Sequence, residues 1–230
     1  MARTFTLLQL RTRARERSDM VNSSFVTDSE LNGYLSASYA ELYDLLVQSG
    51  LVYYTPTTQT ITANGNESYA LPADYYGTIR VDRQIGGDYF PLSEYMITER
   101  HKYENLSGEA DVYSPQGANL SLLPAPSGGT YRHIYIPAPV DLGDSSSVTD
   151  STTIDGVSGW EEYIIADAAR KMLQKEESST VAIERDLTRL RARIEEAAQN
   201  RAWATPRRVS DVTDKAVSRT DWWRYAGTDV

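Results

Sequence analysis

The sequence predicts an α+β protein: a helical core of about four main helices with an inserted antiparallel β region and an extended C-terminal tail. Near both ends of the chain, apolar residues recur every three or four positions, as they do along one face of an amphipathic helix. Between them, residues 51–138 alternate between apolar and polar and are rich in Thr and Tyr, which is typical of half-buried strands. Residues 205–230 follow neither period, so we expect a tail outside the regular core.

We expect five segments along the 230 residues. They are N-terminal core helices (1–50), an inserted β-rich domain (51–138), a long loop (139–158), a C-terminal helical hairpin of the core (159–204) and the tail (205–230). An amphipathic helix cannot bury its apolar stripe alone, so the two helical segments must pack on each other.

The N-terminal segment contains signals for two helices. Residues 5–17 predict a short basic helix, which starts at a capping box formed by Thr6 and Gln9. A longer helix is predicted over residues 28–48, with Thr27 and Glu30 as a second capping box. Its apolar positions follow the helical period: Leu31, Tyr34, Leu35, Tyr39, Leu42, Leu45 and Leu46.

Turn-forming residues predict where the strands of the β region begin and end. Asn64-Gly65 and Gly86-Gly87 each predict a hairpin between alternating runs, and residues 93–106 predict a short helix. The stretch LSLLPAPSGGTYRHIYIPAP, residues 120–139, predicts a hairpin of two strands around a turn rich in Pro and Gly. In YALPADYY, residues 69–76, we expect a strand that ends at a turn capped by the Asp74 carboxylate.

Two further helices are predicted at the C-terminal side, the first starting at Trp160. Ser178 to Thr180 is the expected break, with Glu184 near the start of the second helix. The apolar stripe of that helix is Val181, Ile183, Leu187, Leu190, Ile194 and Ala197 or Ala198. Charges of both signs alternate on its other faces, as on a solvent-exposed helix.

Composition excludes several classes of protein. The chain has no cysteine, which excludes disulfides, thiolate metal sites and cysteine nucleophiles. It has two histidines, His101 and His133, which we interpret as a surface helix residue and a cross-strand contact, so we expect no metal site and no cofactor. No apolar run is long enough to cross a membrane. For the arginine-rich N-terminus, a first helix is favoured over a transit peptide.

The net charge of −9 is unevenly distributed. Residues 1–20 carry +3, residues 21–179 carry −14 and residues 180–230 carry +2. An acidic body does not grip nucleic acid through its phosphates, because that requires clustered Lys and Arg. It can surround DNA without adhering to it, since like charges repel.

No active-site pattern stands out, so we expect no catalytic residues. The run GVSGW at residues 156–160 resembles a nucleophile elbow, but it lacks the second glycine at the required position. A pair of catalytic carboxylates cannot be excluded by counting acids, but in a chain this acidic a solvated face is the favoured explanation of paired acids.

The tail contains the run DWWRY at residues 221–225. Trp, Tyr and Arg are the preferred hot-spot residues of protein interfaces, and two adjacent Trp are costly to expose. Docking on a partner is favoured over folding back on the chain's own domain.

Taken in order, five stretches resemble the head-to-tail adaptor (connector) proteins of tailed bacteriophages. They are residues 25–46 (FVTDSELNGYLSASYAELYDLL), 69–76, 120–139, 160–178 (WEEYIIADAARKMLQKEES) and 190–212 (LRARIEEAAQNRAWATPRRVSDV). The resemblance spans roughly residues 5–212, and the ordered set carries it rather than any single motif.

This resemblance implies a non-enzymatic structural protein of the virion, located in the neck and assembled in the host cytoplasm. Adaptors of this kind form a ring, usually of twelve copies, below the portal protein. The ring extends the channel through which double-stranded DNA passes, and it provides the platform for tail or nozzle proteins. Alternatives are another neck or tail-completion protein, or a tail-associated glycan hydrolase.

The resemblance also suggests roles for three groups of residues. Portal binding is assigned to residues of the tail: Arg207, Arg208, Trp222, Trp223, Arg224 and Tyr225. After Asp211 no family pattern matches, so this tail assignment rests on composition alone. Subunit and core helix packing is assigned to Leu31, Tyr34, Leu42, Leu45, Leu187, Leu190 and Ile194. The β turn expected to face a tail protein comprises Pro124, Ala125, Pro126 and Gly128.

Overall fold

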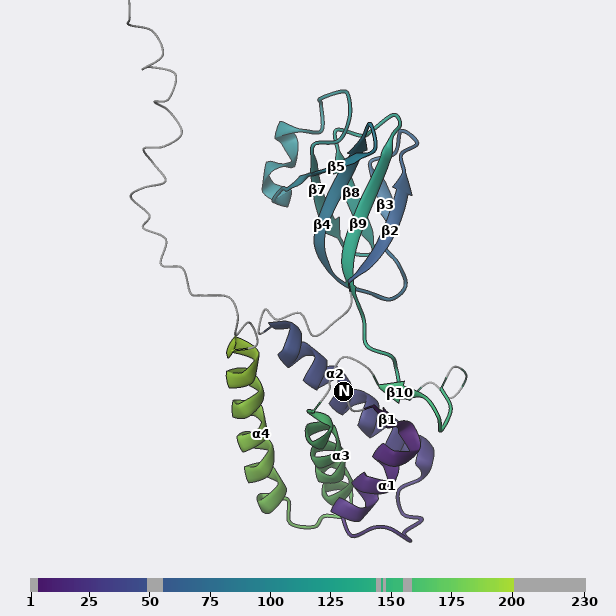
Figure 1. Ribbon diagram of the computed structural model, residues 1–230, viewed down its shortest axis with the longest axis vertical. Coiled ribbons are helices and arrows are strands. Elements are labelled where there is room, and N and C mark those ends of the chain that lie inside the picture. Colours follow the sequence, from purple (N-terminus) through teal and green to yellow (C-terminus); the bar gives the residue numbers. More distant parts are fainter. Residues whose placement is uncertain (1–3, 49–55, 144–145, 147, 155–158, 201–230) are drawn as a thin grey trace, which may run out of the picture.

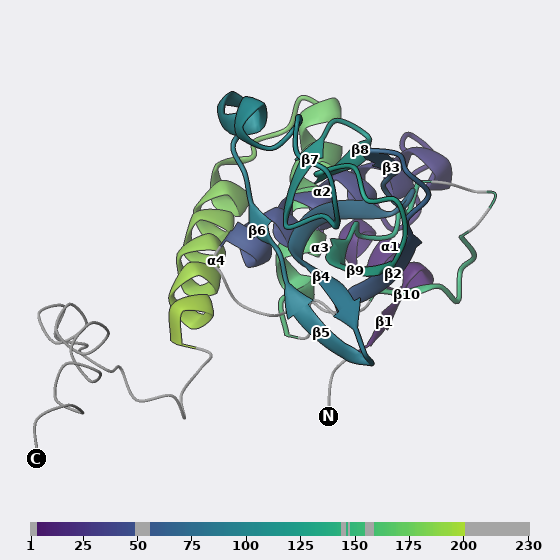
Figure 2. The ribbon, with the colours of Figure 1, turned by 90° about the horizontal axis from the view of Figure 1, so that it is seen from above.

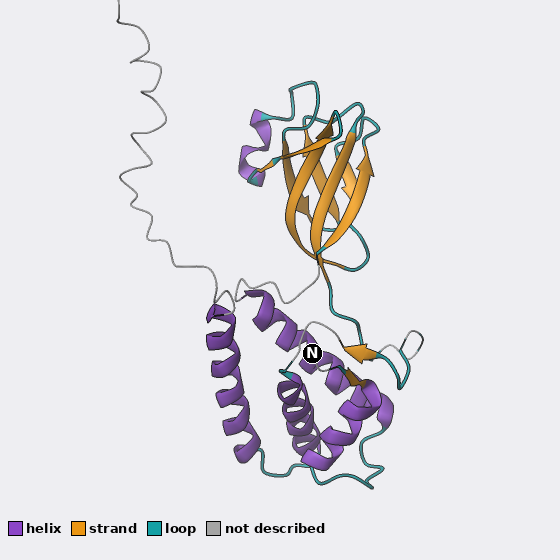
Figure 3. Cartoon of the chain, in the orientation of Figure 1, coloured by secondary structure: helices purple, strands orange, loops and turns teal. Residues whose placement is uncertain are grey.

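The computed structural model describes residues 4–48, 56–143, 146, 148–154 and 159–200, with no side-chain detail for 198–200. The described part contains a helical body and a β domain that lies beyond one end of it (Figure 1). The main helices are α1 (Leu7–Arg17), α2 (Asp28–Gln48), α3 (Glu161–Lys175) and α4 (Val181–Asn200). The α+β prediction of four main helices with an inserted, mainly antiparallel β region is therefore confirmed (Figure 3).

The helical body has one apolar core. Helix α3 lies at its centre and packs against α1, α2 and α4. Ile164 of α3 is fully buried together with Leu35 of α2 and Leu10 of α1, so helices from both ends of the chain share one interior. The expected packing between the two helical segments is thus confirmed.

Buried charge also holds the helical body together. Arg11 of α1 is 8% exposed, and its guanidinium forms ion pairs with Asp28 at the start of α2 and with Asp150. Arg15 makes a second ion pair with Asp28 at 2.9 Å. These contacts join α1, α2 and the segment that precedes β10 (Thr153–Ile154).

The helix starts agree in part with prediction. The capping box of Thr6 and Gln9 is present in full. At α2, the Glu30 amide donates to the Thr27 hydroxyl at 3.3 Å. The Glu30 carboxylate instead accepts bonds from Tyr34 at 2.8 Å and Lys175 at 2.6 Å, so the second capping box is only half formed because a tertiary ion pair competes for the carboxylate.

The β domain consists of two four-stranded sheets. The first has the order β2-β9-β4-β5, formed by Thr57–Thr62, Thr130–Pro137, Tyr75–Ile85 and Asp88–Pro91. The second has the order β3-β8-β7-β6, formed by Ser68–Ala70, Asn119–Leu123, Val112–Gln116 and Ser93–Glu94. All pairs are antiparallel except β6 with β7. Val81 and Tyr131 of the first sheet meet Leu120 and Leu122 of the second in a separate apolar core.

Two of the predicted hairpins are wrong. Asn64-Gly65 connects β2 to β3, and the turn after Leu123 connects β8 to β9, but each connection crosses between the sheets instead of joining paired neighbours. Local turn chemistry predicted the reversals, whereas pairing is decided by contacts between distant segments. The hairpin at Gly86-Gly87 is confirmed: Ile85 pairs with Asp88, and both glycines have the positive φ that a tight two-residue turn requires.

Three further predictions need correction. Residues 93–106 hold a short strand and a six-residue 3-10 helix, η1 (Ile97–Lys102), instead of one α-helix. Val181 is 54% exposed, because it is the first residue of α4, whereas Ile183 in the same turn is buried. The expected long loop contains β10, which pairs with β1 (Phe5–Thr6), a pairing too short to leave a periodic signal.

Candidate functional site

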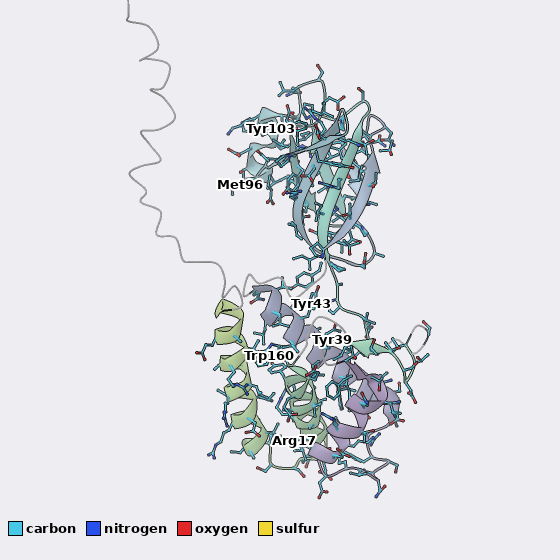
Figure 4. The ribbon with its side chains drawn as sticks, viewed as in Figure 1. Arg17, Tyr39, Tyr43, Met96, Tyr103 and Trp160 are labelled. Atoms are coloured by element: carbon cyan, nitrogen blue, oxygen red, sulfur yellow. The ribbon has the colours of Figure 1, made fainter. Side chains whose placement is uncertain are left out.

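The two bodies are connected by Tyr43, near the end of α2 and labelled in Figure 4, and by Tyr76 of β4. The Tyr43 hydroxyl donates to the Pro137 carbonyl at 2.6 Å, and the Tyr76 hydroxyl of β4 donates to the Asp44 carboxylate at 2.5 Å. The two rings meet edge to face, with centroids 5.5 Å apart. Burial, together with the Asp44 charge, raises the pKa of Tyr76 to about 12, so this hydroxyl stays protonated and remains a donor.

Asp74 reinforces the same junction. Its carbonyl accepts a bond from the Ala138 amide at 2.6 Å, and its carboxylate accepts one from the Tyr135 hydroxyl at 2.9 Å. The predicted cap, in which the carboxylate binds backbone amides of its own turn, is wrong, since the carboxylate accepts from the Tyr135 hydroxyl of β9 instead.

A groove of about 710 Å³ lies beside this junction, between α2 and residues 138–143. On the α2 side it is lined by small residues, among them Gly33, Ala37 and Ala40. Asp44 and Asp141 also line it, and both are exposed. The α2 side of the groove therefore carries mostly small side chains, and the groove is negatively charged.

A second groove, of about 440 Å³, lies between α4 and the α2–α3 pair. Three carboxylates line it: Glu41, Asp167 and Glu184. Glu41 accepts bonds from Tyr163 at 2.8 Å and from Arg191, and Glu184 accepts one from Thr180 at 2.7 Å.

Asp167 is the most buried of these carboxylates, at 2% exposed. Burial alone would raise its pKa, but bonds from Lys171, Ser38 and Arg170 outweigh that effect and lower it. Lys171 lies 2.7 Å and Arg170 2.8 Å from its two oxygens.

A glycosidase needs one carboxylic acid with a raised pKa to protonate the leaving group. The groove offers the reverse arrangement, because Asp167 is held ionised by two cations and Glu41 is paired with Arg191. Its geometry is that of a structural ion-pair network connecting α2, α3 and α4. Among the described residues, no group of acids and histidines is arranged to hold a metal ion.

His133 confirms its interpretation as a cross-strand contact. It is fully buried, and its ring lies between Gln59 of β2 at 3.2 Å and Thr78 of β4 at 3.0 Å. The Gln59 amide nitrogen donates to the Ala70 carbonyl, so its oxygen is left to accept from the ring Nδ1. Burial lowers the pKa of His133 to about 4, so the imidazole is neutral at pH 7. His101 is exposed on η1, as predicted.

Exposed apolar side chains gather around η1 on the β domain. Met96 is 71% exposed, and Ile97 and Leu106 are each 57% exposed. Figure 4 shows Met96 at the outer side of this domain, together with Tyr103. Exposed apolar clusters of this kind are typical of protein contact surfaces.

The predicted packing residues lie inside the helical body. Leu31, Leu42 and Ile194 are fully buried, so they pack the helices of one chain. Partly buried positions against the same core are Tyr34, Leu45, Leu187 and Leu190.

The predicted turn lies at the end of the β domain that is distant from the helices (Figure 1). Pro124 and Pro126 are buried there, which leaves Ala125 exposed and Gly128 half-buried. The portal-binding residues of the tail, Arg207 to Tyr225, lie outside the described residues.

Sequence reasoning missed the residues that connect the parts. Ser38 and Asp167 are polar residues within apolar stripes, and such positions are the available signal for a buried pair. Tyr43 and Tyr76 offered no comparable signal, because tyrosine occurs 16 times in the chain.

By its fold, the chain is a helical-core protein with an inserted β domain, and its described grooves are lined by paired or exposed charges. A family model described as the SU10 adaptor protein matches residues 5–210. The chain therefore belongs to the SU10 adaptor protein family, and its role is that of an adaptor in the phage virion. Adaptors of this family are structural and typically not enzymes. No curated protein matches the chain. No helix among the described residues has the length and apolar character needed to span a bilayer.

Proposed function

We propose that the chain is the head-to-tail adaptor of its virion, forming a ring of twelve copies below the portal protein. The ring extends the channel for double-stranded DNA and provides the platform on which tail or nozzle proteins assemble. The family match carries this proposal, because it covers the helical body and the β domain together.

The two-body architecture supports this role. One ring must contact the portal protein on one side and a tail protein on the other, and the chain has two separately cored bodies available for such contacts. We assign copy-to-copy contacts to the helical body and the tail-protein contact to the β domain. The exposed apolar cluster at Met96, Ile97 and Leu106 and the turn around Ala125 are the surfaces of the β domain that fit this contact.

The acidic composition supports passage of DNA. Residues 21–179 carry −14, and this charge disfavours adhesion to phosphates. DNA would then pass through the channel without being bound specifically by the chain.

An omission experiment tests the proposal. Particles assembled without the chain should contain packaged DNA but no tail, and supplying the chain in trans should restore tailed particles. If particles without the chain carry normal tails, the adaptor role is wrong.

The tail assignment has its own test. We propose that residues 206–230 bind the portal protein, with Trp222 and Trp223 as anchors and Arg207, Arg208, Arg224 and Tyr225 around them. Deleting residues 206–230 should weaken binding to isolated portal protein at least tenfold, as measured by biolayer interferometry. Undiminished affinity would rule out this use of the tail.

A further inference from the structure

Helix α4 presents an unpartnered face. Its core side is formed by Ile183, Leu187, Leu190 and Ile194, while Arg185 and Arg189 lie on the opposite side and are exposed. Neither of these arginines has an ion-pair partner among the described residues. By contrast, Arg191 on a flank of the same helix is paired with Glu41.

Small side chains border these arginines. Ala182 and Ala192 are exposed on the same face, and they leave the α4 backbone open to close approach by another helix. Arg193 continues the basic row, with its guanidinium 5.8 Å from the Trp160 ring. From Arg185 to Arg193 the row spans eight residues, which is about 12 Å along a helix. We call this surface the arginine row.

The groove beside α2 has the complementary character. Gly33, Ala37 and Ala40 form a floor without long side chains, and Val140 is an exposed apolar residue of the wall. Such a floor admits a neighbouring helix at short distance. We call this surface the acidic groove.

Two carboxylates of the acidic groove are held by neutral donors. Asp44 accepts from the Tyr76 hydroxyl, and Asp141 accepts from the Ser36 hydroxyl at 2.6 Å and the Gly143 amide at 2.8 Å. Neither carboxylate forms an ion pair within the described part of the chain. Hydrogen bonds therefore fix the orientation of both carboxylates, but no cation compensates their negative charges within the described part of the chain.

The spacing of the charges also matches. Asp141 is anchored at Ser36, and Ser36 and Asp44 are eight residues apart on α2, about 12 Å along the helix axis. This equals the span of the arginine row. The two surfaces thus agree in charge and in length.

The arginine row lies on the outer face of α4, and the acidic groove lies on the outer face of α2, where Gly33, Ala37 and Ala40 are exposed. The segment that follows the groove continues away from α4. In Figure 1 and in the view turned by 90° in Figure 2, α4 borders one side and residues 148–152 the other. A contact between unlike patches on separate sides joins chains head to tail, and such contacts close into rings when the rotation allows.

We infer that the arginine row of one copy docks in the acidic groove of a second copy of this chain. The inference rests on the proposed ring and specifies the two surfaces that close it. A nucleic acid partner for the row is disfavoured, because the body that surrounds it is acidic, with −14 over residues 21–179.

Cross-linking tests the contact, and the absence of cysteine from the chain removes background. Particles are assembled with the variant Ala37→Cys/Ala192→Cys and treated with a short bismaleimide. We expect a ladder of cross-linked chains, at least tenfold above either single-cysteine variant. Ala70→Cys/Ala192→Cys is the matched control, since Ala70 is exposed on the β domain.

Charge reversal provides an independent test of the docking contact. Arg185→Glu/Arg189→Glu should lower the number of chains per particle at least tenfold, and adding Asp44→Lys/Asp141→Lys to the same chain should restore it. Arg13→Glu reverses an exposed arginine of α1 outside both surfaces, and as the control for charge reversal it should leave the number of chains per particle unchanged.

The outcomes separate the two proposals. Tailed particles that contain the chain but give no ladder, or that tolerate the Arg185/Arg189 reversal as well as the control, overturn the docking inference alone. Tails that form without the chain overturn the adaptor role itself. Loss of DNA binding by the Arg185/Arg189 variant, without a change in chain number, would assign the row to nucleic acid and also overturn the inference.

Discussion

A buried carboxylate of the helical body and a buried histidine of the β domain are stabilised in opposite ways. In the helical body, Asp167 is ionised and surrounded by Lys171, Arg170 and Ser38. In the β domain, His133 is neutral and hydrogen-bonded to Gln59 and Thr78. The Asp167 ion pairs stabilise the fold as long as the carboxylate and its cations remain charged. Buried His133, by contrast, is compatible with the fold only while its imidazole is unprotonated. The two bodies should therefore differ in their response to mutation and to acid.

The largest expected effect is in the helical body. Asp167→Ala leaves Lys171 and Arg170 facing a buried site without their counter-charge, and should lower the free energy of unfolding by about 3 kcal/mol. Chemical denaturation followed by helical circular dichroism measures it. Asp186→Ala is the matched control, because Asp186 is half exposed in its pair with Arg17 and should cost less than about 1 kcal/mol. Equal losses of unfolding free energy in the Asp167→Ala and Asp186→Ala variants would contradict a special role for the buried ion pairs.

Acid should affect the β domain first. The pKa of His133 is about 4 in the folded protein, against about 6.5 for an unperturbed histidine, so the unfolded chain binds the proton more tightly. The contribution of His133 is complete above about pH 6.5 and is lost as the pH falls towards 4, for a total of about 3 kcal/mol. Asp167 has a lowered pKa, so its contribution persists until the pH falls below its ordinary value of 3.8.

Hydrogen exchange resolved by segment, at pH 7, 5.5 and 4.5, measures this difference. Protection of β4 and β9 should fall over this range while that of α2 and α3 stays nearly constant. His133→Asn should flatten the response, and His101→Asn, at an exposed position, should leave it intact. A parallel decline in both bodies would mean that they unfold as one unit.

The smallest effect concerns the connection between the bodies. Tyr76→Phe keeps the ring contact with Tyr43 but removes the bond to Asp44, at a cost of about 1 kcal/mol. The β domain should then move more freely on α2, which small-angle scattering would detect as a broader distribution of distances. Tyr89→Phe on the exposed strand β5 serves as the control, and an identical distribution for both variants would contradict a restraining role of Tyr76.

Much of the helical body could be predicted from sequence, because its signals are local. The period of the α2 stripe and the capping box at Thr6 depend on residues three or four positions apart. The β domain was predicted as a region but not as a topology. Nothing near Asn64-Gly65 indicates that β2 pairs with β9, some 70 residues later, instead of with β3.

The candidate surfaces were the least predictable part. The arginine row and the acidic groove become visible only when the fold places Asp141 beside Ser36 and exposes one side of α4. In the sequence, these residues belong to an unremarkable acidic loop and a mixed-charge helix. Contacts between distant segments, such as Tyr43 with Pro137, leave no periodic trace either.

A reconstruction of the phage neck at side-chain resolution tests most directly whether the two bodies serve two kinds of neighbour. We expect a closed ring in which helical bodies of adjacent copies are in contact and the β domains contact a different virion protein. Adjacent copies that touch only through their β domains, with the helical bodies separated, would contradict this division of roles.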